Sequence, residues 1–377
     1  MSQGEASVPD APDAPDAPDA VGEPDVVGGP DAVGRDESTK VERAVMRGVE
    51  RVAGVTDEIV HHPGPNGARA LVNAFFGDRL DVAGSALSHT MGVRRRGRSV
   101  PLTRDGLAAA YPEATGEVVV LVHGLLVTET FWQQGRFGHR LHEDLGLTPV
   151  TVRYNTGLRI SHNGHDLDRI LTALVAHWPV PVTRIVLVGH SMGGLVVHSA
   201  LAQADVDGPG SEWVSRVSDT VTLGSPHLGA PLERGANHAA RALGTLRHVR
   251  PLAGLLRSRS VGIQDLRHGN ILDEEWDGAD PADWRARRVD VPLHPGIRHL
   301  AVVGLLGRKI DSRVAQLFGD GIVTAASARG AGRRSPERRR FPAEDVVVLP
   351  GVSHVALVRD ESVYAAIRER LGARVDP

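Results

Sequence analysis

One stretch of ten residues constrains the fold more than any other part of the chain. Ile185–Val188 is a run of four apolar, mostly β-branched residues that leads directly into Gly189-His190-Ser191-Met192-Gly193 and a further glycine. The segment Leu195–Ala202 follows and has the length and apolar content of a buried helix. A strand, an abrupt turn and a helix in this order predict that Ser191 has a strained backbone conformation, with its oxygen pushed out at the carboxyl edge of a sheet.

The glycines around Ser191 have a steric reason. A side chain two residues before or after the serine would collide with the neighbouring strand and helix. The helix that follows points its unpaired N–H groups and positive dipole end at the same place, where a negatively charged oxygen would be stabilised. A Gly-x-Ser-x-Gly sequence also occurs in ordinary turns, but the flanking strand and helix favour Ser191 as a nucleophile.

Apolar strands alternate with helices from Glu117 onward. Near-continuous apolar strands of this kind indicate a mostly parallel sheet with helices on both faces. The expected strands are Val118–Val122, Val150–Tyr154, Ile185–Val188, Thr220–Leu223, His299–Val303 and Asp345–Leu349, and the expected helices are Asp166–Trp178, the helix that begins at Ser191, and Glu361–Leu371. The pattern breaks between about 230 and 295. Because a structureless loop of that size is improbable in a compact domain, this insertion is predicted to be a helical cap over the active-site edge.

A serine hydroxyl needs an imidazole base and a carboxylate that orients the base. In known hydrolases that this strand–turn–helix arrangement resembles, the acid and then the base follow the serine along the chain, on loops after later strands. His354, between the last strand and the last helix, is the leading base, because His299 opens a strand at its wrong end and His294 precedes every candidate acid in the late strands. Asp320 is the leading acid, since its flanking glycines expose the carboxylate, and Asp311 is the alternate.

Two backbone N–H groups should bind the negatively charged oxygen of the reaction intermediate. The first is that of Met192, directly after the serine, and the second is predicted to be that of Leu125, in the loop after the strand Val118–Val122. Three further histidines lie close to these segments in the sequence. His123 and His190 are interpreted as structural, and for His227 a structural hydrogen bond is favoured over contact with substrate.

Composition bounds the remaining possibilities. The 377 residues suffice for one large α/β domain, and the absence of cysteine excludes disulfides, thiolate catalysis and cysteine metal sites. The net charge of −3 is uneven, because residues 1–38 contain ten acidic residues and only Arg35. Four copies of Pro-Asp-Ala form Pro9–Ala20, and Gly, Pro and Asp dominate the residues that follow to about Asp36. Residues 1–37 cannot bury enough apolar surface to order the chain, so this tail is predicted to be disordered, and a solubilising role is favoured over that of an interaction arm.

The expected domain organisation has three parts: residues 1–37 as the acidic tail, 38–112 as a helical extension packed on the body, and 113–377 as the α/β domain. Val41, Val45 and Val49 share one face of a helix after Ser38. Such a basic amphipathic helix can lie on a membrane, but packing on the body is favoured. The triplets Arg94–Arg96 and Arg338–Arg340 are interpreted as solvated charge, with no aromatic residues between them to form a nucleic-acid surface.

No secretory signal and no apolar run of membrane-spanning length are evident in the sequence, so a cytoplasmic location is expected. Peripheral contact with a membrane is compatible with this expectation. No cofactor or metal is expected, and the sequence does not indicate an oligomeric state.

With these residues placed, the chain resembles the lipase/esterase branch of the α/β-hydrolase superfamily. It is most similar to bacterial triacylglycerol lipases and to GPI-inositol-deacylase-like hydrolases. The residues that carry the resemblance are His123-Gly124-Leu125, Gly189–Gly194, Leu223–Pro231, Gly319–Val323 and His354. The resemblance implies Ser191 as nucleophile, Asp320 as acid, His354 as base, Leu125 and Met192 as oxyanion donors, and a mobile cap over an acyl pocket.

The favoured hypothesis is therefore a serine hydrolase that cleaves carboxylic esters, of lipids or small molecules, through an acyl-enzyme. An acyltransferase or thioesterase with the same three residues differs only in the acceptor or the leaving group, and nothing in the sequence separates them. A catalytically silent hydrolase fold that acts as a binding module is a third hypothesis, from a different class.

Overall fold

The computed structural model describes residues 65–204, 212–230, 260–278, 289, 291–307, 318–331 and 341–373. Several predictions concern segments outside these ranges. They include the acidic tail, the amphipathic helix after Ser38, the alternate acid Asp311 and most of the expected cap insertion.

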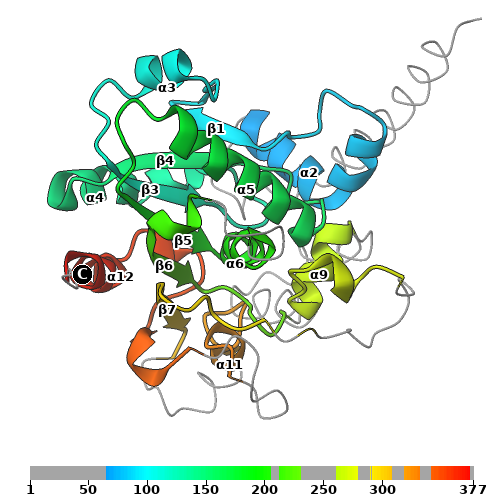
Figure 1. The fold of residues 1–377 in the computed structure, drawn as a ribbon. Coiled ribbons are helices and arrows are strands. Elements are labelled where there is room, and N and C mark those ends of the chain that lie inside the picture. The colour runs from blue at the N-terminus through cyan, green and yellow to red at the C-terminus, as the bar shows by residue number, and fades with distance from the viewer. Residues whose placement is uncertain are drawn as a thin grey trace, which may run out of the picture.

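An eight-stranded sheet forms the centre of the molecule (Figure 1), with the strand order β2-β1-β4-β3-β5-β6-β7-β8. The six strands from β4 to β8 run parallel to one another, and the hairpin β1-β2 joins β4 in the antiparallel direction. The strands are β1 (Gly92–Arg95), β2 (Arg98–Ser99), β3 (Glu117–Val122), β4 (Thr148–Arg153), β5 (Arg184–His190), β6 (Val217–Leu223), β7 (Arg298–Leu305) and β8 (Val346–Pro350). This arrangement confirms the predicted mostly parallel α/β architecture.

Helices cover both faces of the sheet, as the apolar strands predict. Successive side chains of β3 alternate between two cores, with Val118 and Val120 in one and Val119 and Leu121 in the other. The first core is closed by α3, α5 and α6, and the second by α4 and α12 (Figure 1). The helices are α2 (Pro65–Val82), α3 (Arg104–Ala110), α4 (Phe137–Leu145), α5 (Ile160–His177), α6 (Met192–Ala204), α9 (Val261–His268), α11 (Ala325–Ala328) and α12 (Glu361–Gly372).

The hairpin β1-β2 differs from the expectation of a helical extension up to residue 112. Arg96 and Gly97 both have positive φ, 49° and 79°, which is the geometry of a two-residue hairpin turn. β1 pairs with β4 from Gly92 to Arg94, and Val93 is buried in the core. The sheet therefore begins upstream of residue 113, where the sequence placed the start of the α/β domain.

Helix α5 begins at Ile160, six residues before the start expected from its apolar pattern. Its first turn carries no side-chain cap of its own. Instead Asp265, from the insertion, accepts a hydrogen bond from the Ile160 N–H (3.0 Å) and one from the Arg159 guanidinium (2.7 Å). A distant carboxylate thus accepts the first backbone N–H of this helix, which no residue within the helix could accept, so tertiary contact helps to determine where the helix starts.

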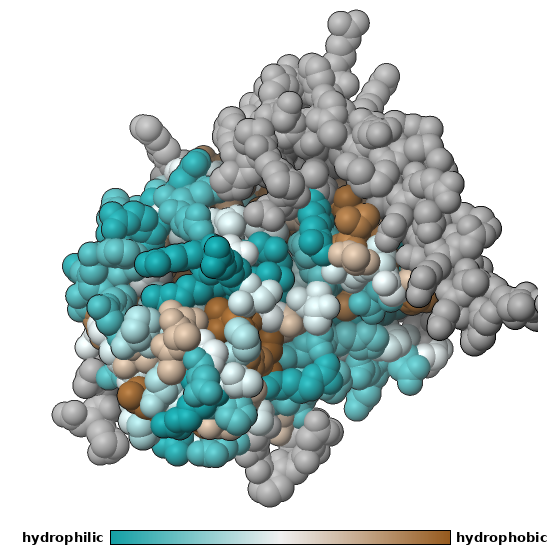
Figure 2. Space-filling view, turned by 90° about the horizontal axis from the view of Figure 1, so that it is seen from above, coloured by the Kyte–Doolittle hydropathy of each residue, from teal (hydrophilic) through white to brown (hydrophobic). Residues whose placement is uncertain are grey.

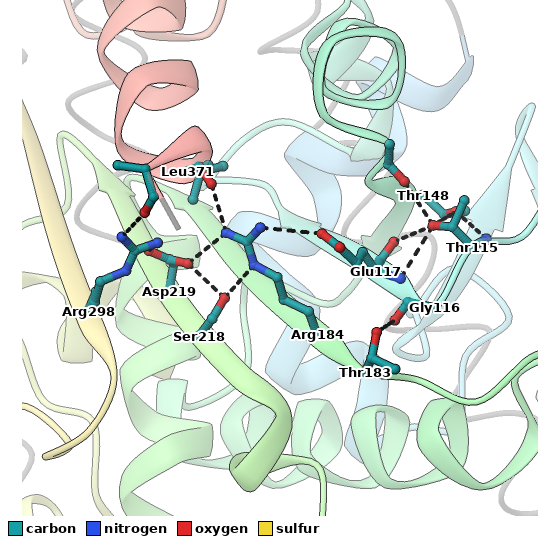
Figure 3. Close-up of polar contacts among 12 residues, drawn as sticks. Thr115, Gly116, Glu117, Thr148, Thr183, Arg184, Ser218, Asp219, Arg298 and Leu371 are labelled. Atoms are coloured by element: carbon teal, nitrogen blue, oxygen red, sulfur yellow. Dashed lines mark hydrogen bonds and ion pairs between the residues drawn. The ribbon is translucent and has the colours of Figure 1, made fainter. Parts of the chain in front are cut away.

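The amino ends of the strands are tied together by a network of charged side chains (Figure 3). Asp219, whose side chain is 1 % exposed, pairs with Arg184 (3.0 Å) on β5 and with Arg298 (2.8 Å) on β7. The two guanidiniums also donate to the carbonyl oxygens of Leu371 and Ala373 at the end of α12, where cations complement the helix dipole. This edge lies opposite the turn at Ser191, so the network anchors the fold and not the site.

The described residues on the face drawn in Figure 2 are largely polar. Figure 2 shows one face on which hydrophilic residues dominate and hydrophobic residues form small separate areas. Within the ranges given above, the large hydrophobic side chains classed as exposed are Val82, Val180, Leu306 and Val355. No helix of the described part is long and apolar enough to cross a membrane.

Candidate active site

Ser191 occupies the turn between β5 and α6 in a strained conformation. Its φ is +53°, which a residue with a side chain rarely adopts, and it is one of four such non-glycine residues in the described ranges. A Cβ at Gly193 would collide with the carbonyl oxygens of Val122 and His123, and one at Gly189 would collide with the backbone of Gly194. The glycines therefore serve the close packing that the sequence predicted for this turn.

The serine is held at the carboxyl edge of the sheet by its neighbour strand. The Ser191 N–H donates to the carbonyl oxygen of Leu223, the last residue of β6, at 2.8 Å. Only 7 % of Ser191 is exposed. Met192 begins α6, so its N–H points out of the first turn of the helix, next to the serine.

Asp320 and His354, predicted as acid and base, are in direct contact. His354 Nδ1 lies 2.7 Å from Asp320 Oδ2. Both side chains are buried, with 8 % of His354 and 2 % of Asp320 exposed. The other carboxylate oxygen, Oδ1, accepts hydrogen bonds from the N–H groups of Ile322 (3.0 Å) and Val323 (2.8 Å). Because a carboxylate faces Nδ1, that nitrogen carries the imidazole proton and Nε2 keeps its lone pair. This is the tautomer that a general base requires.

The turns around Asp320 explain how the carboxylate is aimed. Gly319 and Gly321 have φ values of +54° and +104°, so the backbone reverses sharply on both sides of the acid. The main chains of the two loops are joined as well, since the His354 N–H donates to the Asp320 carbonyl oxygen at 3.0 Å. The acid and the base therefore form a fixed unit.

The serine and the acid–base pair lie on either side of Gly224. A Cβ at Gly224 would lie 2.8 Å from Asp320 Oδ2 and 3.1 Å from His354 Nδ1, and the residue before it, Leu223, binds the Ser191 N–H. No hydrogen bond joins the Ser191 hydroxyl to another described residue, His354 included. The structure thus brings the predicted acid Asp320 and the predicted base His354 together, and it shows no hydrogen bond from Ser191 to His354.

His190, within the serine turn, connects this turn to the base. Its Nε2 donates to the His354 carbonyl oxygen at 3.1 Å, and the two rings lie 4.8 Å apart. Burial holds the pKa of His190 well below its usual value, so the ring stays neutral. The sequence interpretation of His190 as structural agrees with this contact, but its role in holding the base loop was not foreseen.

The loop after β3 lies against the serine turn. A Cβ at Gly124 would lie 3.0 Å from the Ser191 Cβ, so the two segments are in close contact at this point. Leu125 is the next residue along the loop. His123 supports the loop: its Nδ1 donates to the Gly124 carbonyl oxygen (2.9 Å) and its ring stacks on Tyr154 at 4.5 Å. Burial lowers the pKa of His123 to about 4, so it is neutral and structural near pH 7.

A buried ion pair behind the same loop was missed in the sequence. The Arg153 guanidinium contacts both carboxylate oxygens of Glu129 at 2.6 Å, and the side chains are 6 % and 4 % exposed. Glu129 opens the short helix that continues the Leu125 loop, and Arg153 ends β4. An arginine at the end of an apolar strand was the one signal available. The pair ties the loop to the sheet.

His227 and His299, weighed for roles at the site, are both buried in structural surroundings. His227 Nε2 lies 3.4 Å from Thr222 Oγ1, and its ring packs on Phe341. His299, at the start of β7, contacts Thr220 Oγ1 at 2.7 Å, on the amino side of the strand as the sequence indicated. Among the residues placed by the structure, no group of three His, Asp or Glu side chains could hold a metal ion.

The sheet order and the serine turn that joins β5 to α6 define an α/β-hydrolase fold. Residues 165–277, which include that turn and α9, match the model of the PGAP1-like alpha/beta domain. The match confirms the resemblance to the lipase/esterase branch of the α/β-hydrolase superfamily.

Comparison with solved structures finds lipases and esterases at low identity. A Bacillus licheniformis lipase in its mature form is 18 % identical, with a TM-score of 0.44, over 68 % of this chain and 91 % of its own. A Pyrococcus furiosus esterase is 14 % identical, with a TM-score of 0.41, over 69 % and 81 %. Lipase B of Aspergillus fumigatus is 11 % identical, with a TM-score of 0.41, over 75 % and 56 %. Comparison with curated proteins finds no significant match.

Proposed function

We propose that the protein is a serine hydrolase that cleaves carboxylic esters through an acyl-enzyme. The observation that carries this proposal is the buried hydrogen bond between His354 and Asp320, beside a serine held at positive φ. Two backbone N–H groups hold the carboxylate so that it faces the imidazole. In serine hydrolases a carboxylate in this position orients the general base.

The mechanism follows from these positions. Ser191 Oγ attacks the ester carbonyl carbon while its proton moves to His354 Nε2, and Asp320 stabilises the imidazolium that forms. The negatively charged oxygen is bound by the N–H groups of Leu125 and Met192, which have no other acceptor among the described backbone groups. Collapse of the intermediate expels the alcohol, whose oxygen takes the proton from His354. Water then attacks the acyl-enzyme by the reverse sequence and releases the acid.

The test is covalent labelling combined with turnover. A fluorophosphonate probe is expected to label the full-length wild type at Ser191, identified by peptide mass spectrometry, and p-nitrophenyl esters are expected to be hydrolysed. Ser191→Ala should lose both. Ser362→Ala is the matched control, because it removes an exposed hydroxyl on α12 and should retain both. Labelling of a different residue, or a Ser191→Ala variant that turns over at the wild-type rate, contradicts the proposal.

A further inference from the structure

Helix α2, which precedes the α/β core in the chain, is locked to two segments near the candidate active site. Figure 1 shows it beside α9 of the insertion. The Ser260 hydroxyl donates to the Ala74 carbonyl oxygen at 2.6 Å, and the Val261 N–H donates to Asp78 Oδ2 at 3.2 Å. The loop after β4 also binds α2, since Asn155 Nδ2 donates a hydrogen bond to the Gly77 carbonyl oxygen at 3.0 Å.

Three glycines bring these backbones into contact. Gly77 is on α2, Gly157 is in the loop after β4, and Gly262 is on α9. A Cβ at Gly157 would overlap the backbone of α2, and one at Gly262 would overlap the carbonyl oxygens of Thr156 and Leu158. The Gly262 N–H also donates to the Gly157 carbonyl oxygen at 3.0 Å. The packing leaves no space for adjustment, so α2 and α9 form one fixed platform.

Apolar side chains of this platform reach the loop that follows β3. Phe75 and Ile263 are buried together, and the partly buried side chains Phe76, Leu125 and Leu126 pack against them. Leu126 is held at a φ of +68°, an unfavourable conformation for a leucine that the surrounding contacts impose. Leu125 follows Gly124, which approaches the Ser191 Cβ. The apolar surface therefore begins one residue from the nucleophile.

The strand order indicates which part of an ester would lie on this surface. Asp320 and His354 follow β7 and β8, on one side of the serine, whereas the Leu125 loop and α2 lie toward β3 and β4, on the other side. The leaving oxygen must face His354 to receive its proton. The acyl chain extends from the same carbon away from the leaving group, and therefore toward the platform.

We propose that Phe76, on a helix outside the α/β core, sets the length of the acyl chain that the enzyme accepts. This inference rests on the proposed function and specifies its substrate as an ester of an aliphatic acid. Its basis is the cluster of Ala74, Phe75 and Ile263, against which both Leu125 of the oxyanion loop and the partly exposed Phe76 pack. Phe76 also packs on Val72 and Leu80 of its own helix, which fixes its position. Each methylene that such a surface covers should raise kcat/KM about fourfold.

The experiment measures kcat/KM of the full-length protein for p-nitrophenyl acetate, butyrate and octanoate. In the wild type, the octanoate-to-acetate ratio is expected to be well above one. Phe76→Ala should lower this ratio about 16-fold, since the lost part of the ring covers about two methylenes at about fourfold each. Phe76→Trp, which fills space instead of removing it, should move the optimum to shorter acyl chains. Val82→Ala, a change at an exposed position at the end of the same helix, should leave the ratio at the wild-type value.

Two further measurements separate the possible failures. A series of alkyl acetates varies the alcohol instead of the acid. If Phe76→Ala changes that series and not the acyl series, the surface holds the leaving group and the inference is overturned. If all esters fall by the same factor in both Phe76 variants while the fluorophosphonate still labels Ser191, α2 has only a structural role and the inference is again overturned. A wild type without labelling would instead refute the proposed function itself.

Discussion

Replacing Asp320 by Asn tests the catalytic proposal most sharply, because the structure determines how the amide must turn. The carboxylate accepts three hydrogen bonds: Oδ1 binds the N–H groups of Ile322 and Val323, and Oδ2 faces His354 Nδ1. An amide NH₂ placed at Oδ1 would oppose two donors, with a penalty of about 1–3 kcal/mol for each lost bond. The amide oxygen therefore stays at Oδ1, and the NH₂ group faces His354.

This orientation reverses the tautomer of the base. Nδ1 must accept from the amide, so Nε2 carries the proton and cannot take one from Ser191. The expected loss in kcat is about 10⁴-fold, equivalent to about 5 kcal/mol of transition-state stabilisation. The assay is steady-state hydrolysis of p-nitrophenyl butyrate near pH 7, with thermal unfolding to verify that the isosteric variant is folded.

Asp311→Asn is the matched comparison, since Asp311 is the alternate acid in the sequence. If Asp320 is the acid, Asp311→Asn keeps kcat within a few-fold of the wild type. A folded Asp320→Asn variant with less than tenfold loss would refute the argument, and a loss confined to Asp311→Asn would transfer the role to that residue.

Three further predictions concern groups around the site and the fold. Asp219→Asn should lower the free energy of unfolding by about 3 kcal/mol, because it leaves two guanidiniums without their buried anion, and urea denaturation measures this. Glu129→Gln should slow fluorophosphonate labelling and destabilise the chain, whereas the double variant Glu129→Leu, Arg153→Met should recover the stability but not a wild-type labelling rate. Stability should fall as the pH drops from 6.5 to 4, since the unfolded chain protonates His123 while the folded chain, with its pKa at about 4, does not. This residue alone contributes about 3 kcal/mol to the fall, and His123→Asn should flatten the profile of unfolding free energy against pH.

Several elements were predictable because their information is local. The strand Glu117–Val122 is visible as an apolar run, since both of its faces are covered. The sharp turn at Ser191 is predictable from the glycines two positions before and after it, which allow the close backbone approach that this turn needs. The last helix ran one residue past its predicted end, from Glu361 to Gly372. The pairing of Asp320 with His354 was predictable as a pair of loop residues after neighbouring strands, although the hydrogen bond itself joins residues 34 positions apart.

Other features depend on partners that no local pattern identifies. The start of α5 at Ile160 is capped by Asp265, 105 positions away, whereas the apolar pattern becomes regular only from Asp166. The hairpin at Arg96-Gly97 contains the basic triplet Arg94–Arg96, which lacks the apolar pattern by which a strand is predicted. The strand forms because its backbone groups pair with β4. The Arg153–Glu129 pair joins two residues that are unremarkable in their own segments.

The sequence by itself determined the periodicity of the strands, the strained serine turn and the order of Ser191 and its proposed partners Asp320 and His354 along the chain. These depend on backbone preferences and side-chain patterns within a few residues. The tertiary structure alone decided that Gly77, Gly157 and Gly262 meet, and hence that a helix from outside the core stands beside the loop after β3. The physical reason is close packing: a Cβ at Gly157 or Gly262 would overlap a neighbouring backbone, and one at Gly77 would overlap the side chain of Asn155. These neighbours come from distant parts of the chain, so no local pattern in the sequence identifies them.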